Sequence, residues 1–201
     1  RFTTPTSPTV TAGAAPNITA HGATLHGTLV DDGGQTCQYQ LRYKTRNGSY
    51  TESKWTGSLG GWNVHFSMTL SKLHPGPRYY FSFRARNDSC AGAWSDERSF
   101  VTLAVTKPTA AMVDVTNVLE RSATFAGNIV DDGNEPCQYR FRYTWRPLLR
   151  IMQGVTPETY TSWTGAKKDG ESFSEDITTL GPNTPYTVTV QARNSAGEGP
   201  W

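Results

Sequence analysis

The sequence predicts an all-β protein built as two tandem antiparallel β-sandwiches. Three observations predict it: a tandem repeat of about 100 residues, apolar and polar residues that alternate with period two, and frequent turn residues. The chain has 19 Gly and 12 Pro among 201 residues, and helix-period runs are missing. Hydrophobic residues make up 36% and charged residues 18%, which favours a globular chain over a disordered one.

The repeat can be read directly from the sequence. The segment 23–33 returns as 123–133, at an offset of 100. The second copy then gains eight residues around 146–153, and further along the chain the offset becomes 107. Four tryptophans belong to repeated pairs, Trp55 with Trp163 and Trp94 with Trp201, whereas Trp62 and Trp145 have no partner. A duplicated unit predicts two similar modules, and structural roles for the repeated tryptophans.

The alternation identifies the strands. Tyr39, Leu41 and Tyr43 share one face of an expected strand, while the residues between them are polar. The same pattern covers residues 79–85 and 186–192. Strict alternation means one buried face and one solvated face, as in two packed antiparallel sheets.

A motif at the end of each unit points to a known family. Leu-x-Pro-x-x-x-Tyr, then alternating apolar residues, then Ala-x-Asn and a glycine, resembles the fibronectin type III module, an Ig-like Greek-key sandwich. The matching residues are Leu73, Pro75, Tyr79, Ala85, Asn87 and Gly92 in the first unit, and Leu180, Pro182, Tyr186, Ala192, Asn194 and Gly197 in the second. The resemblance implies that Tyr79 and Tyr186 are tyrosine corners, whose hydroxyls bond back to the backbone.

The second strand departs from the family pattern. A core Trp is usual there, whereas this chain has His26-Gly27 and Ala126-Gly127, so we expect Trp55 and Trp163 to supply the missing bulk. The Asp-Asp-Gly-x-x-x-Cys-Gln-Tyr variant resembles bacterial or archaeal surface repeats more than animal matrix proteins.

The expected organisation is a last strand of a preceding module with a linker at 1–7, one module at 8–104, and a second at 105–201 that lacks its last strand. Arg1-Phe2-Thr3-Thr4-Pro5 resembles Arg98-Ser99-Phe100-Val101-Thr102, the last strand of the first module. An open sheet edge is a template for pairing. Either the polypeptide continues past both ends, or the Arg1–Pro5 strand of one copy completes the second module of its neighbour. Both alternatives predict a linear array.

Composition and motifs argue against several function classes. The net charge of +2 does not favour a nucleic-acid partner, and no apolar run is long enough to span a membrane. Catalytic and cofactor motifs are missing, and the four histidines lack metal-ligand spacing, so neither an enzyme nor a cofactor is expected. Up to Lys107 the chain has 11 Lys/Arg and 6 Asp/Glu, and beyond it 8 and 11. Opposite signs favour head-to-tail contact, although ordinary scatter of surface charge is the alternative.

Three cysteines favour an oxidising compartment. Cys37 and Cys90 lie in or beside loops that cluster at one end of this kind of sandwich, so a Cys37–Cys90 disulfide is a candidate. Cys137 is then left over, as a buried thiol or as an intermolecular crosslink.

Other candidate sites are weaker. Asp31 and Asp32, repeated as Asp131 and Asp132, offer carboxylates to Ca²⁺, or simply form a turn. N-glycosylation triplets begin at Asn17, Asn47 and Asn87. The unpaired Trp145 and the inserted loop form an expected interface, or a small satellite core, through Trp145, Leu148, Leu149, Ile151 and Met152, with Phe2 as a further contact.

These observations predict a non-enzymatic repeat unit of an extracellular or surface fibre, filament, stalk or adhesin. Its expected partners are other copies of itself or adjacent modules. The alternative is an accessory module that binds surface glycans or proteins, attached to an enzyme or receptor elsewhere in the chain; a fold alone does not decide between them.

Overall fold

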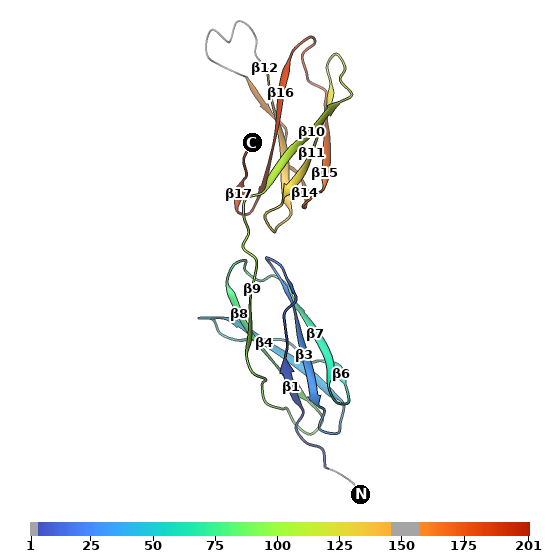
Figure 1. Ribbon diagram of the computed structural model, residues 1–201, viewed down its shortest axis with the longest axis vertical. Coiled ribbons are helices and arrows are strands. Elements are labelled where there is room, and N and C mark those ends of the chain that lie inside the picture. Colours follow the sequence, from blue (N-terminus) through green and yellow to red (C-terminus); the bar gives the residue numbers. More distant parts are fainter. Residues whose placement is uncertain (1–3, 146–156) are drawn as a thin grey trace. The chain divides into compact units, whose positions relative to one another are not determined.

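The computed structural model describes residues 4–145 and 157–201. The chain divides into two compact units, Arg1–Ala104 and Val105–Trp201, here called module 1 and module 2. Within the described ranges every regular element is a strand, and each module is a sandwich of two antiparallel sheets (Figure 1). No helix in these ranges is long and apolar enough to cross a membrane. The expected all-β class with two tandem sandwiches is confirmed.

Module 1 packs a four-stranded sheet on a five-stranded one. In the first sheet β3 pairs with all three other strands, and in the second β4 lies between β8 and the short β5 and β6. The first sheet contains β1 (Thr9–Ala12), β2 (Asn17–Ile18), β3 (Ala23–Asp31) and β7 (Val64–Leu70). The second contains β4 (Cys37–Thr45), β5 (Thr51–Glu52), β6 (Thr56–Leu59), β8 (Arg78–Arg86) and β9 (Arg98–Val101).

Module 2 repeats this arrangement. Its first sheet has the order β10-β11-β15, and its second places β12 between β16 and the short β13 and β14. The strands of the first sheet are β10 (Thr109–Thr116), β11 (Ala123–Asp131) and β15 (Ser172–Ile177). Those of the second are β12 (Cys137–Trp145), β13 (Glu158–Tyr160), β14 (Thr164–Lys167), β16 (Tyr186–Asn194) and β17 (Gly197–Glu198).

A glycine and a phenylalanine replace the core Trp that the second strand lacks. Gly27 on β3 is paired in register with Phe66 on β7, and a Cβ at Gly27 would come within 2.4 Å of the Phe66 ring. The bare glycine lets that ring lie over the strand and stack on Tyr39, with centroids 4.2 Å apart. In this way a cross-strand aromatic covers the gap left by a strand glycine.

Module 2 fills the same position in the same way. Phe173 lies over Gly127, and its ring stacks on Tyr139 with centroids 3.7 Å apart. The expectation that Trp55 and Trp163 supply the core bulk is wrong, because both rings lie on arginines and not in the core clusters.

The tyrosine corners are confirmed. The Tyr79 hydroxyl accepts a hydrogen bond from the backbone N–H of His74 at 2.9 Å. The Tyr186 hydroxyl accepts the equivalent bond from Gly181 at 2.7 Å. Each bond fixes the turn before the strand that carries the tyrosine, so it holds the β8 and β16 ends in place.

In each module the side chain of an asparagine is hydrogen-bonded to the backbone of the segment that precedes the first strand. The Asn87 amide donates to the carbonyls of Thr6 (2.8 Å) and Asp32 (3.2 Å). Asn194 does the same with Thr106 (2.6 Å) and Asp132 (2.9 Å). The entering segments therefore belong to the modules that follow them.

The glycine after each asparagine makes room for that segment. A Cβ would lie 2.0 Å from the Pro8 carbonyl oxygen at Gly92 and 1.8 Å from that of Pro108 at Gly199. Gly199, rather than Gly197, is thus the counterpart of Gly92, which corrects the motif assignment.

Candidate functional site

A row of alternating arginines and aromatic rings covers the outer face of the β4–β8 sheet in module 1. The Arg42 guanidinium lies 4.3 Å from the Tyr50 ring centre and 4.4 Å from that of Trp94. Arg84 lies between Trp94 (4.3 Å) and Trp55 (5.1 Å), and Arg86 follows at 4.6 Å from Trp55. We call this row the arginine–aromatic stack of module 1. Such cation–π contacts stabilise by about 0.5–2 kcal/mol each, depending on exposure.

The edges of these guanidinium groups are also engaged. Arg84 Nε donates to the Gln40 side-chain oxygen at 2.9 Å, and Arg86 donates twice to that of Gln38, at 3.1 and 2.8 Å. Arg84 also forms an ion pair with Glu52 at 3.4 Å. The flat faces of the guanidinium groups contact aromatic rings, and their N–H groups donate to side chains on the neighbouring strand. The stack therefore connects β4, β8 and the loops beside them.

Module 2 has an arginine–aromatic stack of its own. The Arg140 guanidinium lies 4.3 Å from the Trp163 ring centre and 5.1 Å from those of Trp201 and Tyr160. The outer members are Arg142 on Trp201 and Arg193 on Trp163, each at 4.4 Å. The repeated tryptophans thus have structural roles in both modules.

Carboxylates border the stack of module 2. Glu198 pairs with Arg140 at 3.2 Å and Glu158 with Arg142 at 3.7 Å. The hydrogen bond that the Tyr160 hydroxyl donates to Glu158 raises the pKa of Tyr160. The sequence signal for both stacks was present, as arginines on the outward period-two positions of paired strands together with repeated tryptophans. The sequence did not show whether the rings of the loop tryptophans turn toward the core or over the outer face of the sheet.

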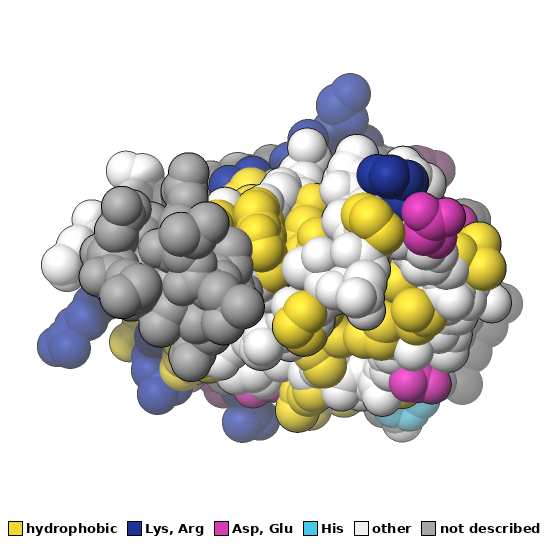
Figure 2. Space-filling view, turned by 90° about the horizontal axis from the view of Figure 1, so that it is seen from above, with side chains coloured by type: hydrophobic (Ala, Val, Ile, Leu, Met, Phe, Trp, Pro, Cys, Tyr) yellow, Lys and Arg dark blue, Asp and Glu magenta, His cyan; other side chains and the backbone are white. Residues whose placement is uncertain are grey.

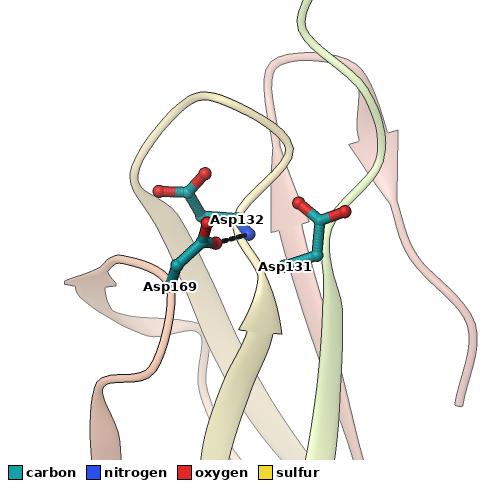
Figure 3. A group of neighbouring side chains, drawn as sticks. All are labelled: Asp131, Asp132 and Asp169. Carbon is teal, nitrogen blue, oxygen red and sulfur yellow. Dashed lines mark hydrogen bonds between the residues drawn. The ribbon is translucent and has the colours of Figure 1, made fainter.

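Three carboxylates gather beside the β11–β12 turn of module 2. One ligand atom from each of Asp131, Asp132 and Asp169 lies within 4.8 Å of the others. Figure 3 shows Asp131 and Asp132 at the end of β11 and just after it and Asp169 on the loop before β15, with the Asp132 N–H donating to Asp169. Asp131 and Asp132 also accept bonds from the N–H groups two residues ahead, at 2.7 and 2.8 Å. These bonds are typical of Asx turns, and they account for the repeated acids without an ion.

Module 1 has only the first two of these acids. Gly61 stands at the position of Asp169, and its N–H donates to Asp32 at 2.6 Å. That bond, followed by the one from Gly34, lowers the pKa of Asp32. Asp31 accepts from the Gly33 N–H at 2.8 Å. The arrangement at Asp31 and Asp32 is a turn held by backbone donors.

The expected Cys37–Cys90 disulfide is wrong in this structure, where Cys37, Cys90 and Cys137 are all free. Cys37 has the same strand parity as Tyr39 and Leu41, so its side chain points into the core, and its thiol lies 3.3 Å from the Asp32 carbonyl oxygen. Cys90 is exposed, with its sulfur 3.0 Å from the Ser7 hydroxyl. Burial, followed by the charges of nearby aspartates, raises the pKa of both Cys37 and Cys137 to about 11. Cys137 is therefore a buried thiol.

The three glycosylation candidates differ in exposure. Asn17 and Asn47 are exposed, so their side chains are available to solvent. Asn87 is only 8% exposed, and both ends of its amide are engaged, since its oxygen also accepts from the N–H groups of Ser89 and Cys90. The interpretation of Asn87 as an acceptor is corrected, because its nitrogen holds the entering segment in the folded module.

The interface candidates lie only partly in the described ranges. Leu148, Leu149, Ile151, Met152 and Phe2 lie outside the described residues. Trp145 is half-buried, and its ring lies 5.9 Å from that of Tyr186. Trp62 is 72% exposed. Of the two unpaired tryptophans, Trp62 is the one that offers a broad free surface.

Comparison with known proteins gives a family model for module 1. Residues 7–101 match the Fibronectin type III domain. Module 2 repeats its strand arrangement, so both modules have the fibronectin type III-like fold. Fasciclin-2 of Schistocerca americana is 26% identical in an alignment of 185 residues that covers 83% of this chain and 20% of that protein. The chain therefore spans about a fifth of the length of this curated relative.

Several solved structures also match. The FN1-FN3 domains of chicken CNTN1 are 17% identical, with a TM-score of 0.39, over 96% of this chain and 65% of that one. A two-domain fibronectin type III segment of chicken tenascin is 17% identical, with a TM-score of 0.32, over 97% and 95%. The sensor domain of the anti-sigma factor RsgI4 in Pseudobacteroides cellulosolvens is 23% identical, with a TM-score of 0.40, over 50% and 98%.

Proposed function

We propose that this chain is a non-enzymatic structural or adhesion-type repeat unit, and that it assembles head to tail with neighbouring copies in an extracellular fibre, filament, stalk or adhesin. The proposal rests on one observation above all. Two sandwiches of the fibronectin type III-like fold follow one another in one chain, and each has one face covered by a stack of arginines and aromatic rings.

The charge distribution supports the head-to-tail direction. The chain has 11 Lys/Arg and 6 Asp/Glu up to Lys107, and 8 and 11 beyond it. A basic module of one copy is attracted to an acidic module of the next, which steers and orients association. Salt screens charges at a protein surface, so it should weaken this attraction.

The arginine–aromatic stacks support a mechanical role. In each module they connect the two long strands of one sheet with the loops beside it. Their guanidinium groups lie against aromatic rings and bond to neighbouring strands. A face occupied in this way stiffens a module, which suits a unit that holds spacing in a fibre.

Sedimentation velocity of the 201-residue chain tests this function. We expect the average sedimentation coefficient to rise with protein concentration and to fall when salt is added, with linear particles visible by electron microscopy at high concentration. A chain that stays monomeric at every concentration and salt level would contradict the proposal.

A binding module is the second candidate, and the 72% exposure of Trp62 favours it. An exposed indole can stack on a sugar ring or a protein side chain. Affinity electrophoresis in polysaccharide-containing gels measures this directly. Retardation that is lost in Trp62→Ala or Trp145→Ala would replace the purely structural function by glycan recognition, whereas equal mobility of all three chains would leave it unsupported.

The extracellular location is part of the proposal, and the exposed acceptors Asn17 and Asn47 are compatible with it. The bacterial or archaeal origin that the Asp-Asp-Gly-x-x-x-Cys-Gln-Tyr variant indicates stays a prediction.

A further inference from the structure

Trp62 is the most exposed of the large hydrophobic side chains that the structure describes, at 72%. The side chains next in exposure are aliphatic. Figure 2 shows hydrophobic side chains gathered at the end of module 2 beside the turn between β10 and β11, where Val118 and Leu119 are 69% and 71% exposed. Aliphatic side chains have no flat ring, whereas an indole presents an apolar face with a polar N–H at its edge. Trp62 is therefore the exposed side chain best suited to stack on a ligand.

The loop that carries Trp62 is held by the rest of module 1. It connects β6 to β7, and Gly61, directly before Trp62, donates its N–H to the Asp32 carboxylate at 2.6 Å. Gly61 has a φ of +100°, a backbone conformation that glycine adopts far more readily than other residues. These features fix the path of the loop, so less ordering is required when a ligand binds.

A cavity lies beside this loop. Its volume is about 520 Å³, which is within the range of small-ligand sites. Thr36 connects the loop with the cavity, because it lines the cavity and a Cβ at Gly60 would lie 3.8 Å from its hydroxyl oxygen. The exposed or half-buried polar side chains that line the cavity are those of Thr36, Gln38, Ser58, Arg86 and Asp88. The indole and these polar groups therefore border one surface of module 1.

Three of the polar groups are available to a ligand. Thr36, Ser58 and Asp88 are exposed, and their side chains form no hydrogen bond with any other residue that the structure describes. A hydroxyl both donates and accepts, and a carboxylate accepts at two oxygens. This set of groups suits a ligand that carries several hydroxyls of its own.

The charges at the cavity favour a neutral ligand. Its charged lining residues are Arg86 and Asp88, which have opposite signs. Arg86 is also engaged within the protein, since it donates twice to the Gln38 side-chain oxygen and its guanidinium lies 4.6 Å from the Trp55 ring centre. A site with balanced charges does not attract a polyanion or a polycation strongly. A sugar has the required chemistry, because its C–H face can lie on an indole while its hydroxyls bond to polar side chains.

We propose that this end of module 1 binds a neutral oligosaccharide, with a sugar ring on Trp62 and sugar hydroxyls bonded to Thr36, Ser58 and Asp88. The inference rests on the binding-module candidate described above and identifies its site and its class of ligand. It is compatible with an adhesin, which holds its target at an exposed surface of a repeat unit.

Module 2 lacks the corresponding groups. The β4–β6 and β12–β14 registers pair Cys37 with Leu59 and Cys137 with Lys167, which aligns the two loops. On this alignment module 2 has no aromatic ring or hydroxyl at three of the positions, where Gly170 replaces Trp62, Ala166 replaces Ser58 and Pro136 replaces Thr36. We therefore expect one oligosaccharide to bind per chain, at module 1.

Isothermal titration calorimetry of the 201-residue chain tests this site. The probes are neutral hexasaccharides of glucose, mannose, xylose and galactose, with hexagalacturonate as the anionic comparison. Trp62→Ala removes the ring, and the double variant Ser58→Ala with Asp88→Ala removes two polar groups. Leu103→Ala is the matched control, because it removes another exposed apolar side chain of module 1 that does not line the cavity.

We expect at least one neutral hexasaccharide to bind, and to bind more tightly than hexagalacturonate. Trp62→Ala and the double variant should each weaken this binding about tenfold or more, and Leu103→Ala should leave it unchanged. Binding that is lost in Trp62→Ala but unchanged in the double variant overturns the cavity as the site and leaves the binding-module candidate standing. Unchanged binding in Trp62→Ala, or tighter binding of hexagalacturonate, also overturns the inference. A chain that binds none of the neutral probes overturns both the inference and that candidate.

Discussion

In both modules an arginine guanidinium lies between two tryptophan rings at the centre of the stack, but the arginine is on a different strand in each module. In module 1 the arginine between the tryptophans is Arg84 on β8, and its partner across the ladder is Gln40 on β4. In module 2 the residues are exchanged, with Arg140 on β12 and Gln191 on β16. The two sequence changes preserve one guanidinium between two indoles and one amide beside it. The comparison teaches that this position requires a chemical group rather than a particular residue.

The modules differ in the ring beside the corner tyrosine. In module 1 Tyr79 is buried beneath Phe100 of β9, with ring centroids 5.6 Å apart. In module 2 the half-buried Tyr186 has the ring of Trp145 beside it, with centroids 5.9 Å apart.

Phe100→Ala should have the largest effect, because it removes the ring that lies on the corner tyrosine of module 1. Removing a buried aromatic side chain leaves a cavity over Tyr79 and Phe81, so we expect the free energy of unfolding of module 1 to fall by about 3–5 kcal/mol. Denaturant unfolding followed by circular dichroism measures it. Val101→Ala, on the 40% exposed neighbour, is the control and should cost less than about 1 kcal/mol. Equal effects of the two substitutions would show that Phe100 does not close the core.

Gly27→Ala and Gly127→Ala test whether both modules depend on the bare strand glycine. The new Cβ would lie 2.4 Å from the Phe66 ring in one module and 2.7 Å from the Phe173 ring in the other. Overpacking of this kind costs about 1–3 kcal/mol, so we expect similar losses of unfolding free energy in both. Gly60→Ala is the control, because nothing lies closer than 3.8 Å to its Cβ position. Stability equal to that of Gly60→Ala would mean that the aromatic rings move aside freely.

Much of the fold could be predicted from the sequence, because period-two alternation and the repeat act locally. Tyr39, Leu41 and Tyr43 were assigned to the inward face correctly, and the tyrosine corners were implied by the resemblance to the fibronectin type III module. The same parity rule applied to Cys37 would have placed its thiol in the core and argued against the disulfide. The expected closeness of the loops at Cys37 and Cys90 was a weaker basis for predicting whether they are bonded.

The arginine–aromatic stacks could not be predicted in this way. Trp55 and Trp94 lie outside the long strands, so no alternation tells whether their rings turn toward the core or over the outer face. The decision depends on Arg42, Arg84 and Arg86, which the β4–β8 register brings together from distant parts of the chain. The sequence signal for such a stack is a Trp that recurs in both repeats, together with arginines at the outward-facing positions of the strands.

Exchanging one ladder pair sharpens the comparison of the stacks. We expect Arg84→Gln alone to lower the unfolding free energy of module 1 by about 1–2 kcal/mol, since it removes contacts with Trp94 and Trp55 and the Gln40 bond. The double variant Gln40→Arg with Arg84→Gln reproduces the arrangement of module 2, and should recover all but about 0.5 kcal/mol. Arg46→Gln, at an exposed turn, controls for loss of charge. Additive losses in the double variant would show that the exchange seen between the modules is not a compensated pair.

The smallest expected effect is a difference in thiol reactivity between the repeated cysteines, Cys37 and Cys137, and Cys90, which has no counterpart in module 2. At pH 8 we expect a thiol reagent to label only Cys90 in the folded chain, because Cys37 and Cys137 are buried, and a pKa of about 11 keeps them protonated. Their labelling should rise only as the pH approaches that value. After unfolding without reductant, all three should react. A single reactive thiol in the unfolded chain would instead mean that a disulfide joins two of the cysteines, and that the inward position of Cys37 does not exclude it.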